Sequence, residues 1–492
     1  MNQALDSPGR EACSHLQLAK CVEGTIGKLI DIGIGPGDAV AIAMPNGPEM
    51  AILFLAVSTI ACAAPLNPAY REAELAFYLG DMDAKLLICP KDGFETAKSV
   101  ANSRGMLVAE VELGRDASCA SLNIDLPVGK MDTYRSYHAN QPGDVALLLH
   151  TSGTTAKPKL VGLTRANIEA SIRNIIATLD LSPADKGLSI LPLFHIHGLM
   201  ATLCAPLLSG GSVVCTEGFD ALRFFRWMDA FRPTWFSAVP SMHQAIVRRA
   251  QRNSEIVEQA SLRFVRSSSA ALAPATLKGL EETFRCPVVE AYGMTEAAHQ
   301  ITSNSLDRQQ PGSVGWQKGT QVRVVNDLWE SVPPGSAGNI VIRGDNIHAG
   351  YINAPAENDK SFRDDWFDTG DQGFLDSQGC LTITGRKKEL INRGGEKIAP
   401  LEIDAILAQD GRIAEAITFG IPHRSLGEDI AVAVVPAEGQ ALTADTVKLS
   451  LAEVLAAHKV PRTVVFLDVI PKGPTGKIQR LKLAEMLGFA NR

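Results

Sequence analysis

The residues best suited to chemistry form a hydroxyl-rich, basic stretch behind an apolar run of strand length. Residues 151–159 read Thr-Ser-Gly-Thr-Thr-Ala-Lys-Pro-Lys and follow the apolar residues 145–149. The four hydroxyls, single glycine and two lysines could surround an anion with N–H groups, hydroxyls and positive charge. The spacing is not that of an ordinary P-loop. The stretch is therefore either a phosphate-binding loop of another kind or a solvated Ser/Thr loop.

A second apolar run leads into an aromatic and acidic segment. Residues 290–296 read Glu-Ala-Tyr-Gly-Met-Thr-Glu. Tyr292 offers an aromatic face for a base, Thr295 a hydroxyl for phosphate, and Glu296 a carboxylate for Mg²⁺. A core tyrosine and a helix-capping threonine would account for the same residues, so this segment alone leaves both interpretations open.

Two segments nearer the C-terminus supply an acid, a guanidinium and an amine. Asp371 could accept hydrogen bonds from both hydroxyls of a ribose, and Arg386 could add a donor nearby. A tight acidic turn followed by the start of a charged helix is the alternative. Lys477 stands in a glycine-flexed turn, Pro-Thr-Gly-Lys-Ile, where a lysine is either functional or simply solvated.

The length and charge exclude several classes of protein. The 492 residues correspond to roughly three domain-sized units. With 47 basic and 54 acidic residues the net charge is −7, whereas a general binder of nucleic acid or anionic membranes needs a basic excess. The most apolar stretch, residues 51–66, is shorter than the roughly 20 residues of a membrane-spanning helix. We therefore expect no nucleic-acid partner and no membrane span, and we expect a buried helix at 51–66.

The cysteines and the two ends of the chain bear on its location. The nine cysteines are scattered between Cys13 and Cys380 without a Cys-x-x-Cys pair, which favours a reducing compartment over a disulfide framework or a structural zinc site. Cys204 and Cys215 lie in apolar sequence, where free thiols are commonly buried. Residues 1–10 lack an apolar signal core, and the C-terminal Ala-Asn-Arg is no organelle address. A cytoplasmic location is expected.

The candidate residues are separated by segments that predict alternating strands and helices. Residues 39–44, 145–149, 288–291 and 339–343 are predicted to form strands, and the continuous apolar run at 145–149 is of the kind that is buried on both faces of a parallel sheet. A helix is predicted after the Pro-Asn-Gly turn at 45–47, through Ala61. Another helix, capped by Thr164 or Asn167, is predicted by one apolar face: Ile168, Ile172, Ile175, Ile176 and Leu179. The alternation indicates an α/β body.

The C-terminal part of the chain predicts a separate, smaller α+β unit. Residues 400–409 and 447–457 are helix-like, and residues 431–435 are strand-like. The segment 371–400 between the two parts is rich in Gly, Asp, Lys and Arg. We therefore expect a boundary at Lys388, with domains at 1–387 and 388–492.

Taken together, in this order and spacing, the four motifs resemble those of the adenylate-forming superfamily of acyl-CoA synthetases, adenylation domains of peptide synthetases, and luciferases. The resemblance extends from about Gly33 to Leu483. Within the superfamily the chain is most similar to the oxalate–CoA ligase group. Four stretches carry this similarity: Pro-Leu-Phe-His-Ile-His-Gly at 192–198, Arg-Ser-Ser-Ser-Ala at 266–270, Thr-Glu-Ala-Ala-His at 295–299, and Ile-Asn-Arg-Gly-Gly-Glu-Lys-Ile at 391–398.

The resemblance implies an α/β fold in which a large N-terminal domain of sheets layered with helices carries a small, mobile α+β C-terminal domain. It also implies an AMP-forming acid–thiol ligase that uses ATP, Mg²⁺ and CoA. A small carboxylic acid would attack the α-phosphate of ATP to give an acyl adenylate and pyrophosphate, and CoA would then displace AMP. The similarity favours oxalate. Alternatives are malonate, a medium-chain or aryl acid, a carrier-protein pantetheine in place of CoA, and a catalytically silent binding protein.

The resemblance also assigns roles to individual residues. The β- and γ-phosphates would be held by Thr151, Ser152, Gly153, Thr154, Thr155 and Lys159. The adenine would lie against Ser269, Ala270, Ala271, Glu290, Ala291 and Tyr292, and the ribose against Asp371 and Arg386. The catalytic set is Thr295 at the α-phosphate, Glu296 on Mg²⁺, and Lys477, whose charge would bridge the carboxylate and the α-phosphate.

Thioester formation and acid recognition involve further residues in the family. The small domain rotates about a hinge that matches Lys388, and it presents to CoA a glycine-rich segment that matches Arg393, Gly394 and Gly395. The phosphate loop departs from the family at Ala156 and Leu160, where many members have glycine. The acid pocket would contain His195, His197, Ser267, Ser269 and His299, whose hydrogen bonds suit a second carboxylate. A plain pocket wall at His195 and a helix histidine at 299 are the alternatives.

Overall fold

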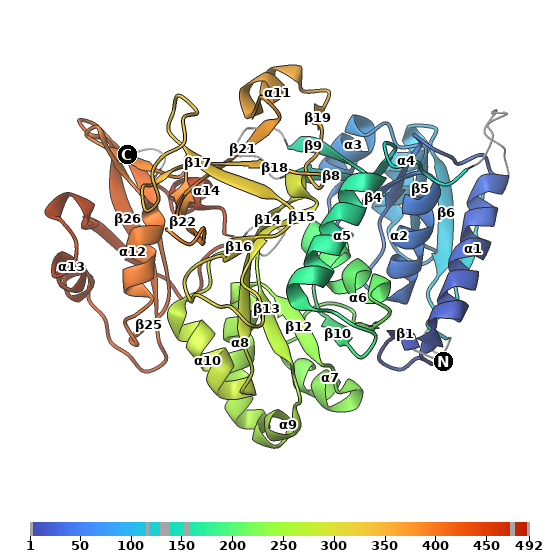
Figure 1. The fold of residues 1–492 in the computed structure, drawn as a ribbon, viewed down its shortest axis with the longest axis horizontal. Helices are drawn as coiled ribbons and strands as arrows, with labels where there is room; N and C mark the ends of the chain where they lie inside the picture. The colour runs from blue at the N-terminus through green and yellow to red at the C-terminus, as the bar shows by residue number, and fades with distance from the viewer. Residues whose placement is uncertain (1–2, 115–117, 128–137, 152–157, 473–477, 490–492) are drawn as a thin grey trace.

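Two twisted sheets with a helix between them form most of the N-terminal domain in the computed structural model (Figure 1). The structure describes residues 3–114, 118–127, 138–151, 158–472 and 478–489. Within these residues the first sheet has eight strands and the second has nine. Helix α5 (Arg165–Leu179) contacts strands of both sheets. The two sheets therefore share one packed layer.

The strands belong to four sheets, in which neighbours in space are often distant in the chain. In spatial order, the first sheet contains β19 (Tyr351–Ile352), β9 (Lys159–Thr164), β8 (Val145–Thr151), β4 (Cys62–Pro65), β3 (Ala39–Ile42), β5 (Leu86–Pro90), β6 (Leu107–Glu112) and β7 (Asn123–Asp125). The second contains β16 (Trp316–Gln317), β15 (His299–Ser303), β14 (Val288–Met294), β13 (Phe264–Ser267), β12 (Trp235–Ala238), β10 (Lys186–Ser189), β11 (Ser212–Cys215), β1 (Gln3–Asp6) and β2 (Cys13–Ser14). The third contains β17 (Gln321–Val325), β18 (Gly338–Arg343), β21 (Trp366–Leu375) and β20 (Phe362–Arg363), with β22 (Leu381–Arg386) on β21. The fourth contains β24 (Glu396–Ile398), β23 (Ile391–Arg393), β26 (Gly427–Pro436) and β25 (Ile413–His423), with β27 (Thr463–Phe466) on β26.

The helices cover the faces of these sheets. Those of the large domain are α1 (His15–Asp31), α2 (Pro48–Ile60), α3 (Glu72–Asp81), α4 (Glu95–Ser103), α5, the π-helix η1 (Gly198–Cys204), α6 (Ala205–Leu208), α7 (Phe224–Phe231), α8 (Pro240–Ala250), α9 (Ser254–Gln259), α10 (Pro274–Phe284), the 3₁₀ turn η3 (Thr295–Ala297) and α11 (Pro355–Ser361). The small domain has α12 (Pro400–Leu407), α13 (Ala444–Ala452) and α14 (Arg480–Met486).

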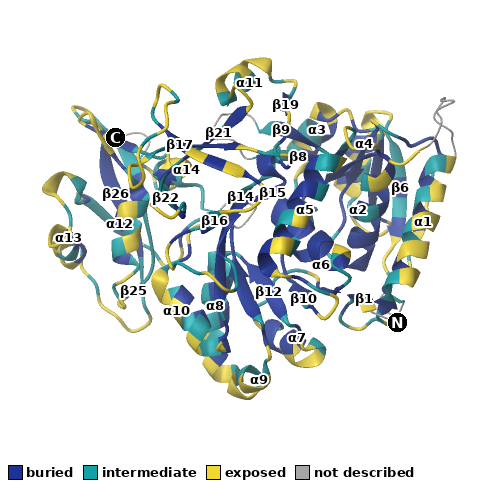
Figure 2. Ribbon diagram, viewed as in Figure 1, coloured by how far each residue is buried: buried dark blue, intermediate teal, exposed yellow. Residues whose placement is uncertain are grey.

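The predicted strands and the capped helix are confirmed. The runs at 39–44 and 145–149 form β3 and β8, and those at 288–291 and 339–343 lie in β14 and β18. β3 is buried along its whole length and pairs in parallel with β4 and β5, as expected for a strand covered on both faces. Strand β12 of the second sheet is likewise buried along its length (Figure 2). Both predicted caps of α5 act together. Thr164 Oγ1 accepts from Asn167 N at 3.2 Å, and Asn167 Oδ1 accepts from Thr164 N at 2.9 Å, which is a capping box.

The prediction of one buried helix at 51–66 is wrong in its second half. Helix α2 ends at Ile60, Ala61 has an extended backbone, and Cys62–Pro65 form β4 between β3 and β8. A fully apolar run has no period that separates helix from strand. Sheet pairing with β3 and β8 decides the outcome, because a strand buried between two others must be as apolar as a buried helix.

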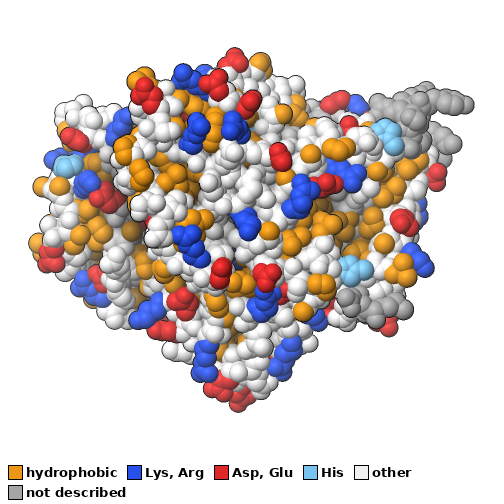
Figure 3. Space-filling model, viewed as in Figure 1, with side chains coloured by type: hydrophobic (Ala, Val, Ile, Leu, Met, Phe, Trp, Pro, Cys, Tyr) orange, Lys and Arg blue, Asp and Glu red, His pale blue; other side chains and the backbone are white. Residues whose placement is uncertain are grey.

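The remaining global features concern the thiols, the surface and the helix lengths. All nine cysteines are free thiols and eight of them, including Cys204 and Cys215, are buried. Acidic and basic side chains are interspersed on the face shown in Figure 3. In the part of the chain that the structure describes, no helix combines the length and apolar character needed to cross a bilayer.

Candidate active site

The loop after β8 connects two paired strands at the edge of the first sheet. Thr151 and Lys159 face each other across the β8–β9 pair, and Thr151 Oγ1 donates to the Lys159 carbonyl at 3.5 Å. The predicted phosphate-binding residues Ser152, Gly153, Thr154 and Thr155 lie between them, outside the described residues, as does Ala156. The two ends of the predicted loop are therefore brought together.

Lys159 connects this loop to the predicted magnesium ligand. Its Nζ pairs with Glu357 Oε2 at 2.6 Å and lies 4.5 Å from the centroid of the Tyr351 ring. Tyr351 Oη in turn donates to Glu296 Oε1 at 3.0 Å. Glu296 is buried in η3 beside Thr295, and burial raises its carboxyl pKa. Sequence reasoning missed Tyr351 and Glu357, because only the long-range pairing of β19 with β9 brings them to the site.

The predicted ribose residues form an ion pair. Asp371 on β21 and Arg386 on β22 are register partners, and Arg386 Nε lies 2.9 Å from Asp371 Oδ1. Tyr292 Oη donates to Asp371 Oδ2. Burial raises the pKa of the Asp371 carboxyl, while Arg386 and the Tyr292 hydrogen bond act in the opposite direction. Residue Arg386 ends a strand, so a charged helix does not begin there.

The predicted adenine residues either follow the carboxyl end of β13 or lie in the middle of β14, where Glu290 is the register partner of Ser267. Ser268 Oγ donates to the Ala291 carbonyl at 2.8 Å and so fastens the loop that carries Ser269, Ala270 and Ala271 to β14. Glu290 Oε2 accepts from Gly312 N at 3.1 Å, and burial raises the pKa of Glu290 to about 7. Carboxyl ends of parallel strands are the usual binding edge of an α/β sheet.

Two of the predicted acid-pocket histidines are stacked. The rings of His197 and His299 have centroids 4.5 Å apart and planes 17° apart, and His197 Nδ1 lies 3.0 Å from Ser269 Oγ. His195 packs its ring on Phe194, with centroids 4.6 Å apart. Ser267 is buried, and its hydroxyl has no hydrogen-bond partner among the described residues.

A buried arginine behind the stacked pair was not singled out from the sequence. Arg266 is 0% exposed, its Nη1 lies 3.0 Å from His197 Nε2, and its Nη2 donates to Gln300 Oε1 at 3.3 Å. No carboxylate in the described part of the chain lies within 4 Å of this guanidinium, and burial lowers its pKa to about 9. The sequence did offer one signal for Arg266, because it is a charged residue inside the apolar run that ends at Ser267.

The predicted glycine-rich segment forms a hairpin turn in the small domain. Gly394 and Gly395 have φ of 62° and 97°, and they join Arg393 to its register partner Glu396. Positive φ at both central residues is typical of a type I′ turn. Arg393 is directed inward, with Nε 2.7 Å from Asp429 Oδ1. Its side chain therefore braces the turn, and the glycine backbone is the part that the turn presents.

The chain around Lys388 passes between two anchored residues. Before it, Arg386 pairs with Asp371 and Lys387 N donates to the Gly370 carbonyl at 3.0 Å. After it, Glu389 Oε2 lies 3.0 Å from Arg480 Nε of the small domain. Lys388 itself is exposed in the turn that joins the two anchors. The predicted catalytic Lys477 lies outside the described residues.

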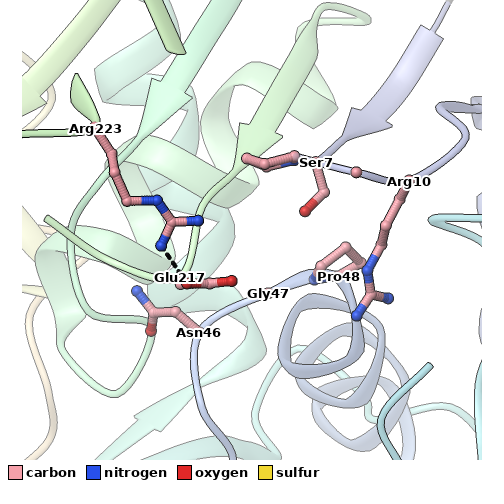
Figure 4. Close-up of a pocket in the computed structure, with 9 residues that line it drawn as sticks. Ser7, Arg10, Asn46, Gly47, Pro48, Glu217 and Arg223 are labelled. Atoms are coloured by element: carbon pink, nitrogen blue, oxygen red, sulfur yellow. Dashed lines mark hydrogen bonds and ion pairs between the residues drawn. The ribbon is translucent and has the colours of Figure 1, made fainter. Parts of the chain in front are cut away.

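A polar cavity lies away from these residues (Figure 4). Its volume is about 470 Å³, and it is lined by Ser7–Arg10, Asn46–Pro48, Glu217 and Arg223. Its two arginines are neutralised, Arg223 by Glu217 at 2.5 Å and Arg10 by Glu49 at 2.6 Å. Asn46 bonds the backbone of Leu191 and Leu193, each at 2.9 Å. The cavity wall thus supports the base of the loop that carries His195 and His197.

The layered α/β domain with an Asp–Arg–Tyr cluster, a buried glutamate and a small C-terminal domain defines an adenylate-forming enzyme. The chain belongs to the AMP-binding enzyme family, whose profile matches residues 3–352, and the AMP-binding enzyme C-terminal domain matches residues 402–477. The resemblance of the motifs to this superfamily is therefore confirmed. The protein is an acid–thiol ligase that joins a small carboxylic acid to CoA through an acyl adenylate, at the expense of ATP.

Relatives with assigned activities extend this similarity over nearly the full chain. The chain is 42% identical to an oxalate–CoA ligase of Arabidopsis thaliana over 490 residues, covering 98% of this chain and 95% of the relative. It is 41% identical to an oxalate–CoA ligase of Saccharomyces cerevisiae, covering 92% and 88%. The structure of ATP-bound MatB from Rhodopseudomonas palustris superposes with a TM-score of 0.88 at 27% identity, covering 99% and 95% of the two chains.

Proposed function

We propose that the enzyme converts oxalate, ATP and CoA into oxalyl-CoA, AMP and pyrophosphate. The observation that carries this proposal is the buried polar cluster of Arg266, His197 and Ser269. Hydrogen-bonding groups held in a buried cluster suit a substrate that has acceptor oxygens beyond the activated carboxyl. A second carboxylate on the substrate would accept hydrogen bonds from Ser269 and the stacked histidines. The oxalate–CoA ligases among the relatives support the same acid.

The first half-reaction must bring the acid's carboxylate against the α-phosphate of ATP, so charge neutralisation and positioning supply most of the catalysis. Lys159, Thr151 and the loop between them would hold the β- and γ-phosphates. Thr295 would contact the α-phosphate. Lys477 would bridge the attacking carboxylate and the α-phosphate with its positive charge.

The nucleoside and the metal would be held by residues that the fold already positions. Asp371 and Arg386 would bind the ribose, with Glu290, Ala291 and Tyr292 beside the adenine. Mg²⁺ is typically held by one or two carboxylates together with phosphates. The described residues contain no cluster of three or more metal-ligating side chains, so Glu296 would share the ion with ATP.

The second half-reaction would need a different arrangement of the domains. We place the boundary at 387/388, with Lys388 as the hinge, because anchored residues flank it on both sides. Rotation there would withdraw Lys477 and bring the turn at Gly394 and Gly395 to the CoA thiol. A pantetheine on a carrier protein could take the place of CoA at the same turn.

The proposal is tested with a panel of acids, scored separately for pyrophosphate release and for thioester formation. Oxalate, malonate, acetate, a medium-chain acid and an aryl acid are each supplied with ATP, Mg²⁺ and either CoA or a carrier protein. Oxalate with CoA should have the highest kcat/KM in both assays. A higher kcat/KM for a monocarboxylic acid would overturn the assignment of a second carboxylate to the pocket.

The pocket itself is tested by His299→Ala. This variant should raise the KM for oxalate about tenfold and the KM for acetate much less, because one hydrogen bond to a charged group is lost only with oxalate. His138→Ala is the matched control, since His138 is exposed and outside the site. Equal losses for both acids would show that His299 does not contact a second carboxylate.

A further inference from the structure

The two ring nitrogens of His197 face groups whose chemistry fixes the position of its proton. Arg266 Nη1 lies 3.0 Å and Ser237 Oγ 2.8 Å from Nε2, while Ser269 Oγ lies 3.0 Å from Nδ1. A guanidinium can donate hydrogen bonds but cannot accept them. Nε2 must therefore be the acceptor nitrogen, because a proton on it would point at the N–H of Arg266.

The proton position on His197 determines the orientation of the Ser269 hydroxyl. A neutral imidazole carries one N–H, so Nδ1 holds the proton and donates it to Ser269 Oγ. Ser269 Oγ then accepts a hydrogen bond from His197 Nδ1, and the hydroxyl proton of Ser269 points away from the ring and can be donated to another group. Ser269 is half-buried, with φ of 75°. This left-handed conformation is uncommon outside glycine, and it sets the direction in which the side chain leaves the backbone.

Arg266 is held in the domain interior, where both of its amino groups donate hydrogen bonds to other side chains. Its second amino group donates to Gln300 Oε1 at 3.3 Å, and Gln300 Nε2 donates to Thr178 Oγ1 at 3.0 Å. These contacts hold the guanidinium against His197 without neutralising it. Replacing buried charges by apolar residues is commonly tolerated or even stabilising, so a contribution to stability alone does not explain an arginine at this position.

We propose that Arg266 is a positioning residue that locks His197 in its Nδ1–H tautomer, so that Ser269 presents a hydrogen-bond donor to the acid substrate. The arrangement selects acids that carry a hydrogen-bond acceptor beyond the activated carboxyl, as the second carboxylate of oxalate does. This statement about the acid rests on the proposed function, whereas the tautomer of His197 does not.

The fixed tautomer of His197 predicts how the KM for oxalate depends on pH in a variant without Arg266. The charged and titratable groups that contact His197 include Arg266 on β13 and His299 on β15, and the hydroxyls of Ser237 and Ser269 also lie against its ring nitrogens. In Arg266→Met, His197 can carry its proton on Nε2 and donate it to Ser237 Oγ. Nδ1 is then an acceptor, and the Ser269 hydroxyl donates to it instead of to the acid. Because a protonated ring again carries Nδ1–H, low pH should lower the KM of this variant for oxalate.

The kinetic test compares KM values for oxalate at two pH values. In Arg266→Met, KM should be about tenfold above wild type near pH 8 and should fall towards wild type as the pH is lowered and His197 gains its second proton. Arg266→Lys keeps a charged donor and should show no such pH dependence. The control is Arg263→Met, since Arg263 precedes the same strand and pairs with Asp185. It should leave KM unchanged at both pH values.

Two outcomes would overturn the proposal. An equal rise of KM at both pH values in Arg266→Met would mean that Arg266 acts through charge or packing. A ¹⁵N spectrum of the histidines in the substrate-free wild type that shows His197 protonated at Nε2 would exclude the lock; His197→Asn assigns the signal. An Nδ1–H tautomer in an enzyme that fails to activate oxalate would refute the proposed substrate and leave the positioning role of Arg266 supported.

Discussion

Asp371 accepts hydrogen bonds from two residues that sequence reasoning assigned to different parts of a nucleotide. Tyr292 and Arg386 each direct a donor at its carboxylate. We expect Asp371→Asn to raise the KM for ATP about tenfold to hundredfold, because a charged acceptor of the ribose hydroxyls is lost. Acid-dependent pyrophosphate exchange measures the effect. Asp368→Asn is the control, since its side chain accepts from Gly370 N at 2.8 Å and asparagine can do the same. An unchanged KM in Asp371→Asn would refute the ribose role.

Glu290 gives a pH-dependent prediction about stability. Burial raises its pKa to about 7, above the ordinary value of 4.5. A raised carboxyl pKa stabilises the fold at low pH, and that stabilisation is lost as the pH rises from about 4.5 to about 7. Glu290→Gln should therefore be more stable than wild type at about pH 8, by at most about 3 kcal/mol, and similar to wild type near pH 4. Urea denaturation at both pH values measures the difference, and an equal difference at both would contradict the assignment.

Arg266 and Tyr351 show why residue-scale roles were only partly predictable. The resemblance of the motifs to a known family assigned Asp371 and Arg386 to one ribose site and His197 and His299 to one acid pocket, but it did not predict the contacts between them. Tyr351 reaches Glu296 only because β19 pairs with β9. Arg266 lies in a quoted motif, but its burial without a carboxylate partner among the described residues is a property of the packed interior. Neither contact is visible in local sequence.

Gly198 controls the element that carries His197. It begins the π-helix η1, and a Cβ at this position would lie 2.2 Å from the Pro192 carbonyl oxygen. π-helical segments occur often at functional sites. Gly198→Ala should displace the start of η1, cost about 1–3 kcal/mol of stability, and raise the KM for the acid more than that for ATP. Steady-state kinetics with each substrate and thermal denaturation measure these effects.

Gly27→Ala is the matched control for this element. Gly27 lies within α1, where a Cβ would meet no atom within 4 Å. Alanine should stabilise that helix by up to about 1 kcal/mol and leave both KM values unchanged. An equal rise of both KM values in Gly198→Ala would show that η1 does not specifically position the acid pocket.

At the scale of elements, the sequence predicted strands better than it predicted junctions. Buried parallel strands such as β3 and β8 are short apolar runs, and the capping box of α5 is a local pattern. The junction at Ala61 was missed because α2 and β4 are equally apolar. Which part of such a run becomes a strand depends on the neighbours that pair with it, and those neighbours lie far away in the chain.

At the scale of the whole molecule, the predicted active-site residues are divided between two domains that one short segment joins. In the large domain, strands β21 and β22 carry Asp371 and Arg386, and the turn η3 carries Glu296. The turn at 394–395 and the segment that contains Lys477 belong to the small domain. The segment at 387–388 is held on one side by Gly370 and on the other by the Glu389–Arg480 pair. We therefore expect backbone rotation to concentrate at Lys388, where neither anchor would have to break.

Lys388→Pro tests that rotation. Proline fixes φ near −65°, so we expect thioester formation to fall at least about tenfold more than adenylate formation, a difference of about 1.4 kcal/mol in barrier height. Single-turnover assays with and without CoA separate the two steps. Lys477→Ala is the opposite reference, since it should abolish adenylate formation and spare ATP binding. A Lys388→Pro enzyme in which both steps fall equally would place the hinge elsewhere. Adenylate formation that survives in Lys477→Ala would show that the lysine of the small domain does not act on the acid.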